Sequence, residues 1–526
     1  MNNAASRTDW KPEVSLNVLL ARAVQAHPET RLHFHTEEGV ASVTTLELLS
    51  TATRLANGLR ALGLRAGDAI AMQLPTQRET AVLYLAALEV GAVLVPIVHI
   101  YGPAEVGFIL RDSGARFLCV PERWRGIDFL ERVDALGSLP DLERVIVVGN
   151  RTPRNGITLA AVEALSQASA IDLYSPHPHP QPQDVCLLLY TSGTTAAPKG
   201  VQHTHQTVGA EWSIPFIDGP GPYFTPFPAG HIAGFNFLLR PFVTATEMVF
   251  TDRWNASLAA ELIERYRVRL SGGTPFHLQG LLEAARLEGR DLSSLAAYGL
   301  GGTGVTPEHI ELADRAGFAG TRAYWLTEHS TVSIGWRDSS FEERACTDGR
   351  VQPGSLVRIV DEMDRALPLG SQGEILTKGP ELFVGYTDPT LNANALTADG
   401  WFRTGDIGKL DSANCLTITD RKKDIVIRGG ENISSQEVER VLATHPAIRD
   451  AAVVGQNDSR YGEKVCAVVV LQQGALLDLA SLQKHFSEAG VARQKTPESL
   501  YIVAELPRTA SGKVRKPDLR RQVNGS

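Results

Sequence analysis

The run DVCLLLYTSGTTAAPKGVQHTH, residues 184–205, places a loop rich in hydroxyls and glycine directly after an apolar strand. Residues 185–190 form the predicted strand. The residues after it that could bind an anion are Thr191, Ser192, Gly193, Thr194, Thr195, Lys199 and Gly200. Hydroxyls donate hydrogen bonds, glycine lets backbone amides approach an anion closely, and lysine adds positive charge. The stretch therefore predicts a phosphate-binding loop.

The spacing within this loop excludes the commonest kind of phosphate loop. A Walker A motif requires glycine, four residues and then Gly-Lys-Ser/Thr. Here Gly193 is followed after four residues by Pro198, Lys199 and Gly200, so a P-loop kinase or ATPase is excluded. Because clusters of Ser, Thr and Gly also mark ordinary surface turns, the phosphate-binding interpretation depends on partner motifs elsewhere in the chain.

Size, composition and charge describe a globular protein of several domains. The chain has 526 residues, 43% of them hydrophobic and 21% charged, which is more than one hydrophobic core usually holds. The net charge of −8 argues against nonspecific binding of nucleic acid. The polar N-terminus and the lack of a long apolar window predict neither secretion nor a membrane span.

The cysteines give a second indication of the compartment. They are scattered, form no CxxC pair and mostly lie in apolar runs: Cys119, Cys186, Cys346, Cys415 and Cys466. This pattern is typical of buried thiols and not of disulfides or metal ligands. We therefore expect a reducing, cytoplasmic location.

The first 150 residues alternate between helical and strand-like apolar patterns. Thr44 and Glu47 have capping-box spacing, and a helical apolar face follows at Leu48, Ala52, Leu55, Leu59 and Leu62. A strand AIAMQL, a helix over residues 79–90 and a strand AVLVPI come next. Such alternation predicts an α/β fold with a largely parallel sheet covered by helices.

Two changes in composition suggest how the chain is divided. The proline-rich run YSPHPHPQPQ, residues 174–183, is expected to be a surface connector. After Asp420, the charged run 421–424 is hinge-like and is followed by helix, strand, strand, helix and strand signals. We therefore predict an N-terminal domain over residues 1–420 and a small α+β domain over residues 421–526.

Five further segments complete the pattern: GLGGTG (299–304), YWLTEHS (324–330), GWFRTGDIG (400–408), DRKKDIVIRGGENISSQEVE (420–439) and PRTASGKVRK (507–516). In this order, together with the opening loop, they resemble the acyl-adenylate-forming superfamily, which includes acyl- and aryl-CoA ligases, adenylation domains of peptide synthetases and luciferases. The resemblance spans nearly the whole chain. It implies a large N-terminal domain with a β-rich portion and a mobile C-terminal domain, with Lys423 as the hinge residue.

The resemblance also implies an ATP site. The β and γ phosphates would be held by Thr191, Ser192, Gly193, Thr194, Thr195 and Lys199, and the floor beside adenine would be Gly301, Gly302 and Thr303. Tyr324 would stack on adenine, Thr327 would bond the α-phosphate and Glu328 would ligate Mg²⁺. Asp406 would accept hydrogen bonds from the ribose hydroxyls, with Arg421 assisting. Lys513 would neutralise the carboxylate and the α-phosphate during adenylation.

Taken singly, these residues have ordinary structural interpretations: a strand end with a surface acid, an Asp turn, a tight glycine loop and a solvated lysine near the C-terminus. The acyl pocket implied by the resemblance consists of His231, Ile232, Phe235, Gly301 and Trp325, and the CoA channel of Gly429, Gly430 and Glu431. His231 could equally be a satisfied core histidine. Trp325 stands where most relatives have glycine, so its indole is expected to shorten the pocket.

The expected function is that of an ATP-dependent acid:CoA ligase acting on a short to medium or alicyclic carboxylic acid. The acid would become acyl-AMP with release of pyrophosphate, and the acyl group would then pass to the CoA thiol with release of AMP. ATP, Mg²⁺ and CoA are the expected cofactors, and a homodimer is compatible with the resemblance. The alternatives are an acyl-AMP ligase that loads a carrier protein and a nonenzymatic nucleotide-binding relative.

Overall fold

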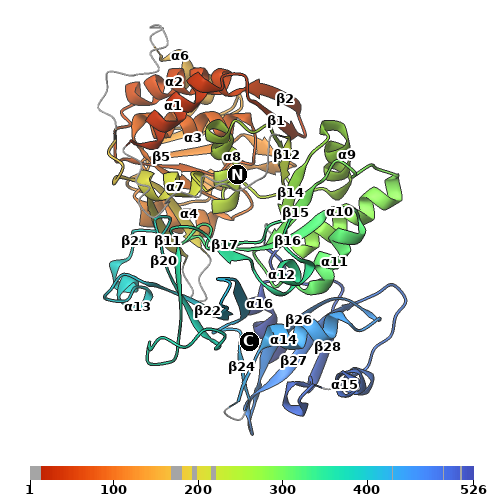
Figure 1. The fold of residues 1–526 in the computed structure, drawn as a ribbon. Helices are drawn as coiled ribbons and strands as arrows, with labels where there is room; N and C mark the ends of the chain where they lie inside the picture. The colour runs from red at the N-terminus through yellow and green to blue at the C-terminus, as the bar shows by residue number, and fades with distance from the viewer. Residues whose placement is uncertain are drawn as a thin grey trace.

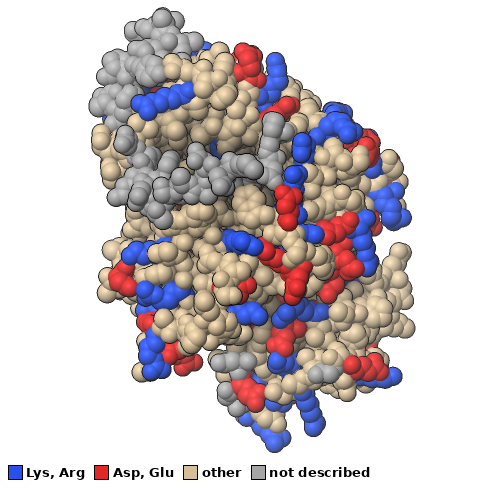
Figure 2. All heavy atoms as spheres, in the orientation of Figure 1, with Lys and Arg blue, Asp and Glu red and all other residues tan. Residues whose placement is uncertain are grey.

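The computed structural model describes residues 14–166, 180–191, 198–214, 221–428, 431–489, 491–509 and 512–525. Figure 1 shows a large layered part, drawn from red to green, and a smaller block in blue that carries the C-terminus. On the face shown in Figure 2, basic and acidic side chains are interspersed. No helix of the described residues is long and apolar enough to cross a membrane.

An eight-stranded sheet carries the strand that precedes the predicted phosphate loop. Its order is β21-β11-β10-β4-β3-β5-β8-β9. The strands are β3 Ala69–Met72, β4 Val93–Pro96, β5 Phe117–Pro121, β8 Arg144–Val148, β9 Gly156–Thr158, β10 Val185–Thr191, β11 Lys199–Thr204 and β21 Gly385–Tyr386. The strands from β9 to β10 pair in parallel, whereas β11 and β21 join antiparallel. All four residues of β3 are buried, as expected of a parallel strand covered on both faces.

A nine-stranded sheet forms the second layer, in the order β18-β17-β16-β15-β14-β12-β13-β1-β2. The strands are β1 Arg31–Thr36, β2 Gly39–Thr44, β12 Tyr223–Thr225, β13 Met248–Thr251, β14 Leu270–Gly273, β15 Ala297–Gly301, β16 Ala319–Tyr324, β17 Ser333–Ile334 and β18 Arg350–Val351. The strands from β1 to β16 pair in parallel and the outer ones antiparallel. The predicted α/β class with parallel-rich sheets is confirmed.

Helices fill the space between the sheets and cover their outer faces (Figure 1). The core shared by both sheets includes α1 Leu16–Ala26, α2 Thr45–Ala61, α3 Arg78–Val90, α7 His205–Trp212 and α8 Ile232–Thr244. The other face of the nine-stranded sheet is covered by α9 Ala256–Tyr266, α10 Pro275–Glu288, α11 Pro307–Arg315 and α12 Phe341–Cys346. The eight-stranded sheet packs on α4 Pro103–Ser113 and α5 Phe129–Asp134, and α6 Leu159–Ala164 lies against α2.

The local predictions in this part are confirmed. Thr44 caps α2, and its side chain and that of Glu47 exchange hydrogen bonds with each other's backbone amides. The predicted apolar face of α2 is buried apart from Leu62, which is only partly covered. Four of the five cysteines are buried and all are free, whereas Cys346 is exposed.

A β-rich portion leads from the layered part to the C-terminal block. It is an antiparallel four-stranded sheet of β19 Leu356–Val360, β20 Gly373–Lys378, β22 Phe402–Leu410 and β23 Leu416–Arg421. Short elements elsewhere are β6 Arg123–Trp124, β7 Ile127–Asp128, the 3₁₀ turn η2 Pro389–Leu391 and α13 Asn392–Ala395. Strand β23 ends at Arg421, where the predicted hinge begins.

The C-terminal block is a small α+β unit around the long strands β26 Ile448–Asp458 and β27 Gly462–Leu471. Its other elements are β24 Val426–Arg428, β25 Glu431–Ile433, α14 Ser435–Ala443, α15 Leu479–Glu488, the 3₁₀ turn η3 Arg493–Lys495, β28 Ser499–Ile502 and α16 Lys516–Asn524. Residues of α14 and α15 share one core with these strands, and residues of α16 share another. Helix α16 was absent from the sequence prediction; its Leu519 and Val523 are buried.

Candidate active site

Lys513 extends from the C-terminal block onto the predicted glycine floor of the N-terminal part. A Cβ added to Gly302 would lie 3.1 Å from Lys513 Cε and 3.5 Å from Trp325 Cζ2, so these three residues meet. Gly302 directly follows β15 with φ +77°, a conformation that favours glycine. The loop that carries Lys513 also contacts α10, where the Arg508 guanidinium lies 5.4 Å from the Phe276 ring centroid.

The electrostatic surroundings of Lys513 are unusual for a lysine. Burial and, to a smaller extent, the cations Arg421 and Lys423 lower its pKa from 10.5 to about 8, while the carboxylates of Asp406 and Glu328 act in the opposite direction. A lysine with a strongly shifted pKa and several charged groups near enough to influence it is a candidate functional group. The structure thus brings the predicted adenylation lysine together with the predicted nucleotide-binding residues.

Asp406 is the centre of a buried hydrogen-bonded group. Tyr324, at the end of β16, donates from its hydroxyl to Asp406 Oδ2 over 2.5 Å, and Arg421 Nε lies 2.9 Å from Asp406 Oδ1. Asp406 and Arg421 are opposite each other on β22 and β23. Burial and the Asp406 carboxylate raise the pKa of Tyr324 well above its usual value, so its hydroxyl remains a donor. Each carboxylate oxygen keeps a lone pair for a further donor.

Glu328 is held in a second polar group, near the end of the phosphate-loop hairpin. Tyr386 donates from its hydroxyl to Glu328 Oε1 over 2.9 Å, and Lys199 Nζ lies 5.4 Å from the Tyr386 ring centroid. Burial raises the pKa of Glu328, although the Tyr386 hydrogen bond opposes this effect. No cluster of three or more metal-ligating side chains occurs in the described part of the chain. Since Mg²⁺ is commonly held by one or two carboxylates plus substrate phosphates, a lone Glu328 fits an ion that arrives with a nucleotide.

Two positioning residues here were not predicted from the sequence. His203 Nε2 lies 2.7 Å from the backbone oxygen of Thr327, and burial lowers the His203 pKa to about 4, so the neutral ring donates this bond. Tyr386 is the other, and it reaches the site because β21 pairs with β11. Both contacts join segments far apart in the chain, so no local spacing could have indicated them.

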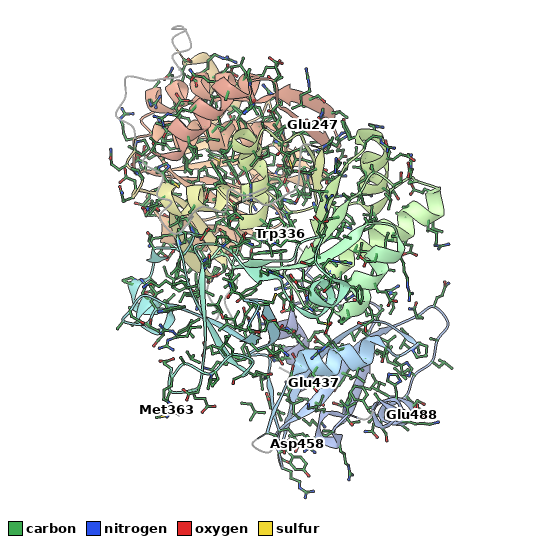
Figure 3. All side chains as sticks on the ribbon, viewed as in Figure 1. Glu247, Trp336, Met363, Glu437, Asp458 and Glu488 are labelled. Carbon is green, nitrogen blue, oxygen red and sulfur yellow. The ribbon has the colours of Figure 1, made fainter. Side chains whose placement is uncertain are left out.

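A cavity of about 140 Å³ begins beside Trp325 and lies between α8 and the nine-stranded sheet. Its apolar lining includes Tyr223, Phe224, Phe227, Ile232, Phe237, Leu270, Ile334 and Trp336. Figure 3 labels Trp336 near the middle of the large part. The floor is made of small residues on parallel strands: Gly272, Ala297, Gly299 and Ala323. This small-residue floor creates the space.

Some of the predicted acyl-pocket residues line the cavity, whereas Phe235 does not. Ile232 and Trp325 line the cavity, and a Cβ on Gly301 would lie 2.3 Å from Trp325 Cζ3. Phe235 instead belongs to the core, 6.4 Å from Trp212 between ring centroids, and is not part of the lining. Trp325 lines the cavity, and further lining residues lie along α8.

His231 immediately precedes α8 and lies close enough to Lys513 to be affected by its charge. Burial, with a smaller contribution from Lys513, lowers the pKa of His231 to about 4, so the ring is neutral at pH 7. Among the described residues, no group hydrogen-bonds to its buried Nε2 atom. One ring nitrogen of this buried histidine thus has no partner among the described residues.

Several predicted residues lie outside the described part of the chain: Ser192, Gly193, Thr194, Thr195, Gly429 and Gly430. Thr191 and Lys199 flank the first of these segments and face each other across β10 and β11. Thr303 is exposed next to Gly302, and Glu431 begins β25 with an exposed side chain.

Residues of the predicted hinge, 421–424, form hydrogen bonds with both the β-rich portion and the C-terminal block. Lys422 Nζ bonds Glu374 of β20 over 2.9 Å. Arg520 of α16 donates to the Lys423 backbone oxygen over 3.0 Å and to Asp424 Oδ1 over 2.7 Å. Lys422 thus contacts the β-rich portion, whereas Lys423 and Asp424 contact α16 of the C-terminal block.

Comparison with known proteins identifies the class. The profile of the AMP-binding enzymes matches residues 20–387, and that of the AMP-binding enzyme C-terminal domain matches residues 437–513. The medium-chain fatty-acid–CoA ligase of Escherichia coli is 34% identical over 92% of this chain and 86% of its own length. A Mycobacterium tuberculosis enzyme named 3-[(3aS,4S,7aS)-7a-methyl-1,5-dioxo-octahydro-1H-inden-4-yl]propanoyl:CoA ligase is 35% identical over 91% and 93%.

The structural comparison agrees. The crystal structure of ATP-bound MatB from Rhodopseudomonas palustris is similar with a TM-score of 0.84 at 27% identity, covering 96% of this chain and 98% of that one. The chain thus shares its fold with a protein whose crystal structure contains bound ATP. The chain belongs to the AMP-binding enzyme family, and the resemblance seen in the sequence is confirmed.

Proposed function

We propose that this protein is an ATP-dependent acid:CoA ligase that forms an acyl-adenylate and transfers its acyl group to CoA. The observation that carries the proposal is the meeting of Lys513, Gly302 and Trp325 at one end of an apolar cavity. The carboxylates of Asp406 and Glu328 influence the pKa of the same lysine. The proposed nucleotide-binding residues therefore lie next to the cavity. Relatives named as acid–CoA ligases over more than nine-tenths of this chain support the same activity.

The nucleotide is bound by groups from four segments. The Asp406 carboxylate accepts from the ribose hydroxyls with Arg421 beside it, and Tyr324 stacks on adenine. Thr327 bonds the α-phosphate, with its backbone fixed by His203. Thr191, Lys199 and the loop between them hold the outer phosphates. Glu328 would hold Mg²⁺ together with the phosphates, and the ion would supply positive charge that offsets the charge of the leaving pyrophosphate.

Adenylation requires two anions to approach each other. The carboxylate of the acid attacks the α-phosphorus, the bond to the bridging oxygen breaks, and pyrophosphate leaves. Lys513 lowers the barrier because its ammonium lies where both anions meet, in a site partly removed from water. Phosphate binding favours the protonated lysine and therefore raises a pKa that is about 8 in the free protein.

Thioester formation is the second step at the same site. The CoA thiol loses its proton, its sulfur attacks the acyl carbonyl, and AMP leaves with the bonding electron pair. His231, neutral and with Nε2 available, lies near the carbonyl end of the cavity, where it can accept the thiol proton. Rotation of residues 421–526 against residues 1–420 about Lys423 exchanges Lys513 for the segment that contains Gly429, Gly430 and Glu431.

The acid is short to medium in length or alicyclic. The two relatives described above are named for a medium-chain fatty acid and for a propanoate on a dioxo bicyclic ring, and the cavity is compact and mainly apolar. The remaining proposals are a cytoplasmic location, assembly as a homodimer and no role in nucleic-acid binding.

The deciding experiment measures AMP release by the purified protein with ATP, Mg²⁺ and a panel of carboxylic acids, with and without CoA. Release that requires both an acid and CoA supports the proposal. The alternative, an acyl-AMP ligase loading a carrier protein, gives enzyme-bound acyl-AMP but releases AMP only when a carrier is added. No adenylate with any acid would support the nonenzymatic nucleotide-binding relative.

A further inference from the structure

The cavity carries polar groups on walls that an unbranched hydrocarbon chain would not need. Helix α8 contributes Ile232, Asn236 and Arg240, which recur every four residues and lie on one helical face. Strand β16 contributes Thr321, opposite Gly299 on β15, so no neighbouring side chain on that strand covers it. Asn236 and Thr321 are both largely buried, at 7% and 6% exposure.

The orientation of the Asn236 amide follows from its partner. Trp212 donates from its indole Nε1 to Asn236 Oδ1 over 3.0 Å, and an indole N–H can only donate. The oxygen is therefore fixed on the Trp212 side, and the NH₂ group is the substituent of the amide carbon that points away from it. Within the described part of the chain, no group accepts a hydrogen bond from Asn236 Nδ2 or bonds Thr321 Oγ1. A ligand that fills the cavity would remove this donor from water, and a buried donor without a partner is costly, so the arrangement points to an acceptor on the ligand.

The two arginines that line the cavity, Arg240 and Arg337, are each already paired with a carboxylate and do not require an anionic group on the ligand. Glu211 and Arg240 form a buried ion pair at 3.8 Å, and Thr331 donates to the same glutamate oxygen over 2.9 Å. Arg337 is paired with Asp338 at 3.3 Å. Because both cations already face a carboxylate, the open position beside Asn236 suits a neutral acceptor and not a carboxylate.

The distance from the reacting end defines where this acceptor lies. Asn236 follows His231 by five residues, which is about 7 Å along the axis of α8. The walls between them are apolar and aromatic, including Phe227 and Phe237. A ligand that fills the space thus has a carboxylate near Lys513, a compact apolar body, and an oxygen at its far end.

We propose that Asn236 is a specificity-determining residue that donates a hydrogen bond from Nδ2 to a ring carbonyl of the substrate, and that the substrate class is therefore oxo-substituted alicyclic carboxylic acids. Thr321 adds a second donor from the sheet side. This inference rests on the proposed acid:CoA ligase activity. An analogue without the carbonyl leaves the amide desolvated and unpaired, which should lower kcat/KM on the order of tenfold to a hundredfold.

The test compares 3-(4-oxocyclohexyl)propanoate with 3-cyclohexylpropanoate in CoA-dependent AMP release. The wild-type protein should prefer the oxo acid, and Asn236→Leu should reduce the ratio of the two kcat/KM values to near one. Thr225→Val is the matched control, because Thr225 lines the same cavity but its hydroxyl already accepts from the Phe227 amide, so the ratio should persist.

The outcomes separate this inference from the activity on which it rests. Turnover of both acids with equal kcat/KM overturns the role of Asn236 while leaving the ligase activity intact. Preference for the oxo acid that survives in Asn236→Leu also overturns it. Turnover of no acid in the panel contradicts the proposed function itself. If the leucine variant fails to fold, the wild-type ratio still tests the substrate class, and Asn236→Asp, which keeps the oxygen that accepts from Trp212 but lacks the NH₂ donor, tests the role of Asn236 with the same two acids.

Discussion

Replacing Lys513 by methionine should weaken adenylation and stabilise the fold at the same time. The pKa of Lys513 falls from 10.5 to about 8, which amounts to about 3 kcal/mol against the charged form. Because the folded-state pKa is the lower one, this cost is present in full below pH 8 and disappears as the pH rises toward 10.5. With its remaining solvent contact, Lys513→Met should raise the free energy of unfolding at pH 7 by about 1–3 kcal/mol.

The catalytic effect has the opposite sign. Removing one preorganised charge at a developing transition state costs on the order of 10²–10³ in rate, so acid-dependent pyrophosphate exchange should fall by about that factor. Thioester formation from supplied acyl-adenylate should remain near the wild-type rate, since it does not use this lysine. Urea unfolding and the two half-reactions, measured on the same preparation, give the complete comparison.

Lys516→Met is the matched control in the same block. Its ammonium bonds Glu439 over 2.8 Å and Ser435 over 2.8 Å, so its loss leaves a buried carboxylate without its cation and should destabilise the fold. Equal loss of both half-reactions in Lys513→Met, or a fall in its stability, would refute the reasoning about Lys513.

The remaining predictions concern the pocket, the metal site and the hinge. Trp325→Gly removes one cavity wall and should shift the preference toward longer acids, measured as kcat/KM across a chain-length series; an unchanged profile would dismiss Trp325 as a size determinant. Tyr386→Phe removes the hydrogen bond that favours ionised Glu328, so the pKa of Glu328 should rise. The Mg²⁺ concentration for half-maximal activity should then increase several-fold at pH 6.5 and less at pH 8. Equal increases at both pH values would count against this. Lys423→Pro fixes one backbone dihedral at the hinge and should slow thioester formation more than adenylation, which rapid-quench kinetics can separate; equal slowing would contradict a hinge at that position.

Much of the fold could be predicted because its signals are local. The capping box at Thr44, the strand before the phosphate loop and the order of elements in the C-terminal block each depend on neighbours in sequence. Helix α16 was missed because its sequence, KPDLRRQVN, is strongly polar, and only Leu519 and Val523 reach the core. A short amphipathic helix at a chain end carries little periodic signal.

The site was predicted from ordered motifs, but its geometry depends on contacts across long separations. His203 and Thr327 are 124 residues apart, and Glu328 and Tyr386 are 58 apart. No spacing rule links such pairs. Phe235 is apolar, as a pocket residue would be, but it lies on the core side of α8, and its sequence neighbours do not show this. The orientation of the Asn236 amide likewise depends on Trp212, 24 residues away in the chain.

The most direct test of the central claim is exchange of labelled pyrophosphate into ATP by the purified protein. If the two parts of the chain bring ATP and a carboxylic acid together at Lys513, exchange should require both the acid and Mg²⁺ and should be nearly lost in Lys513→Met. Exchange that proceeds without an acid, or that is unaffected by Lys513→Met, would contradict it.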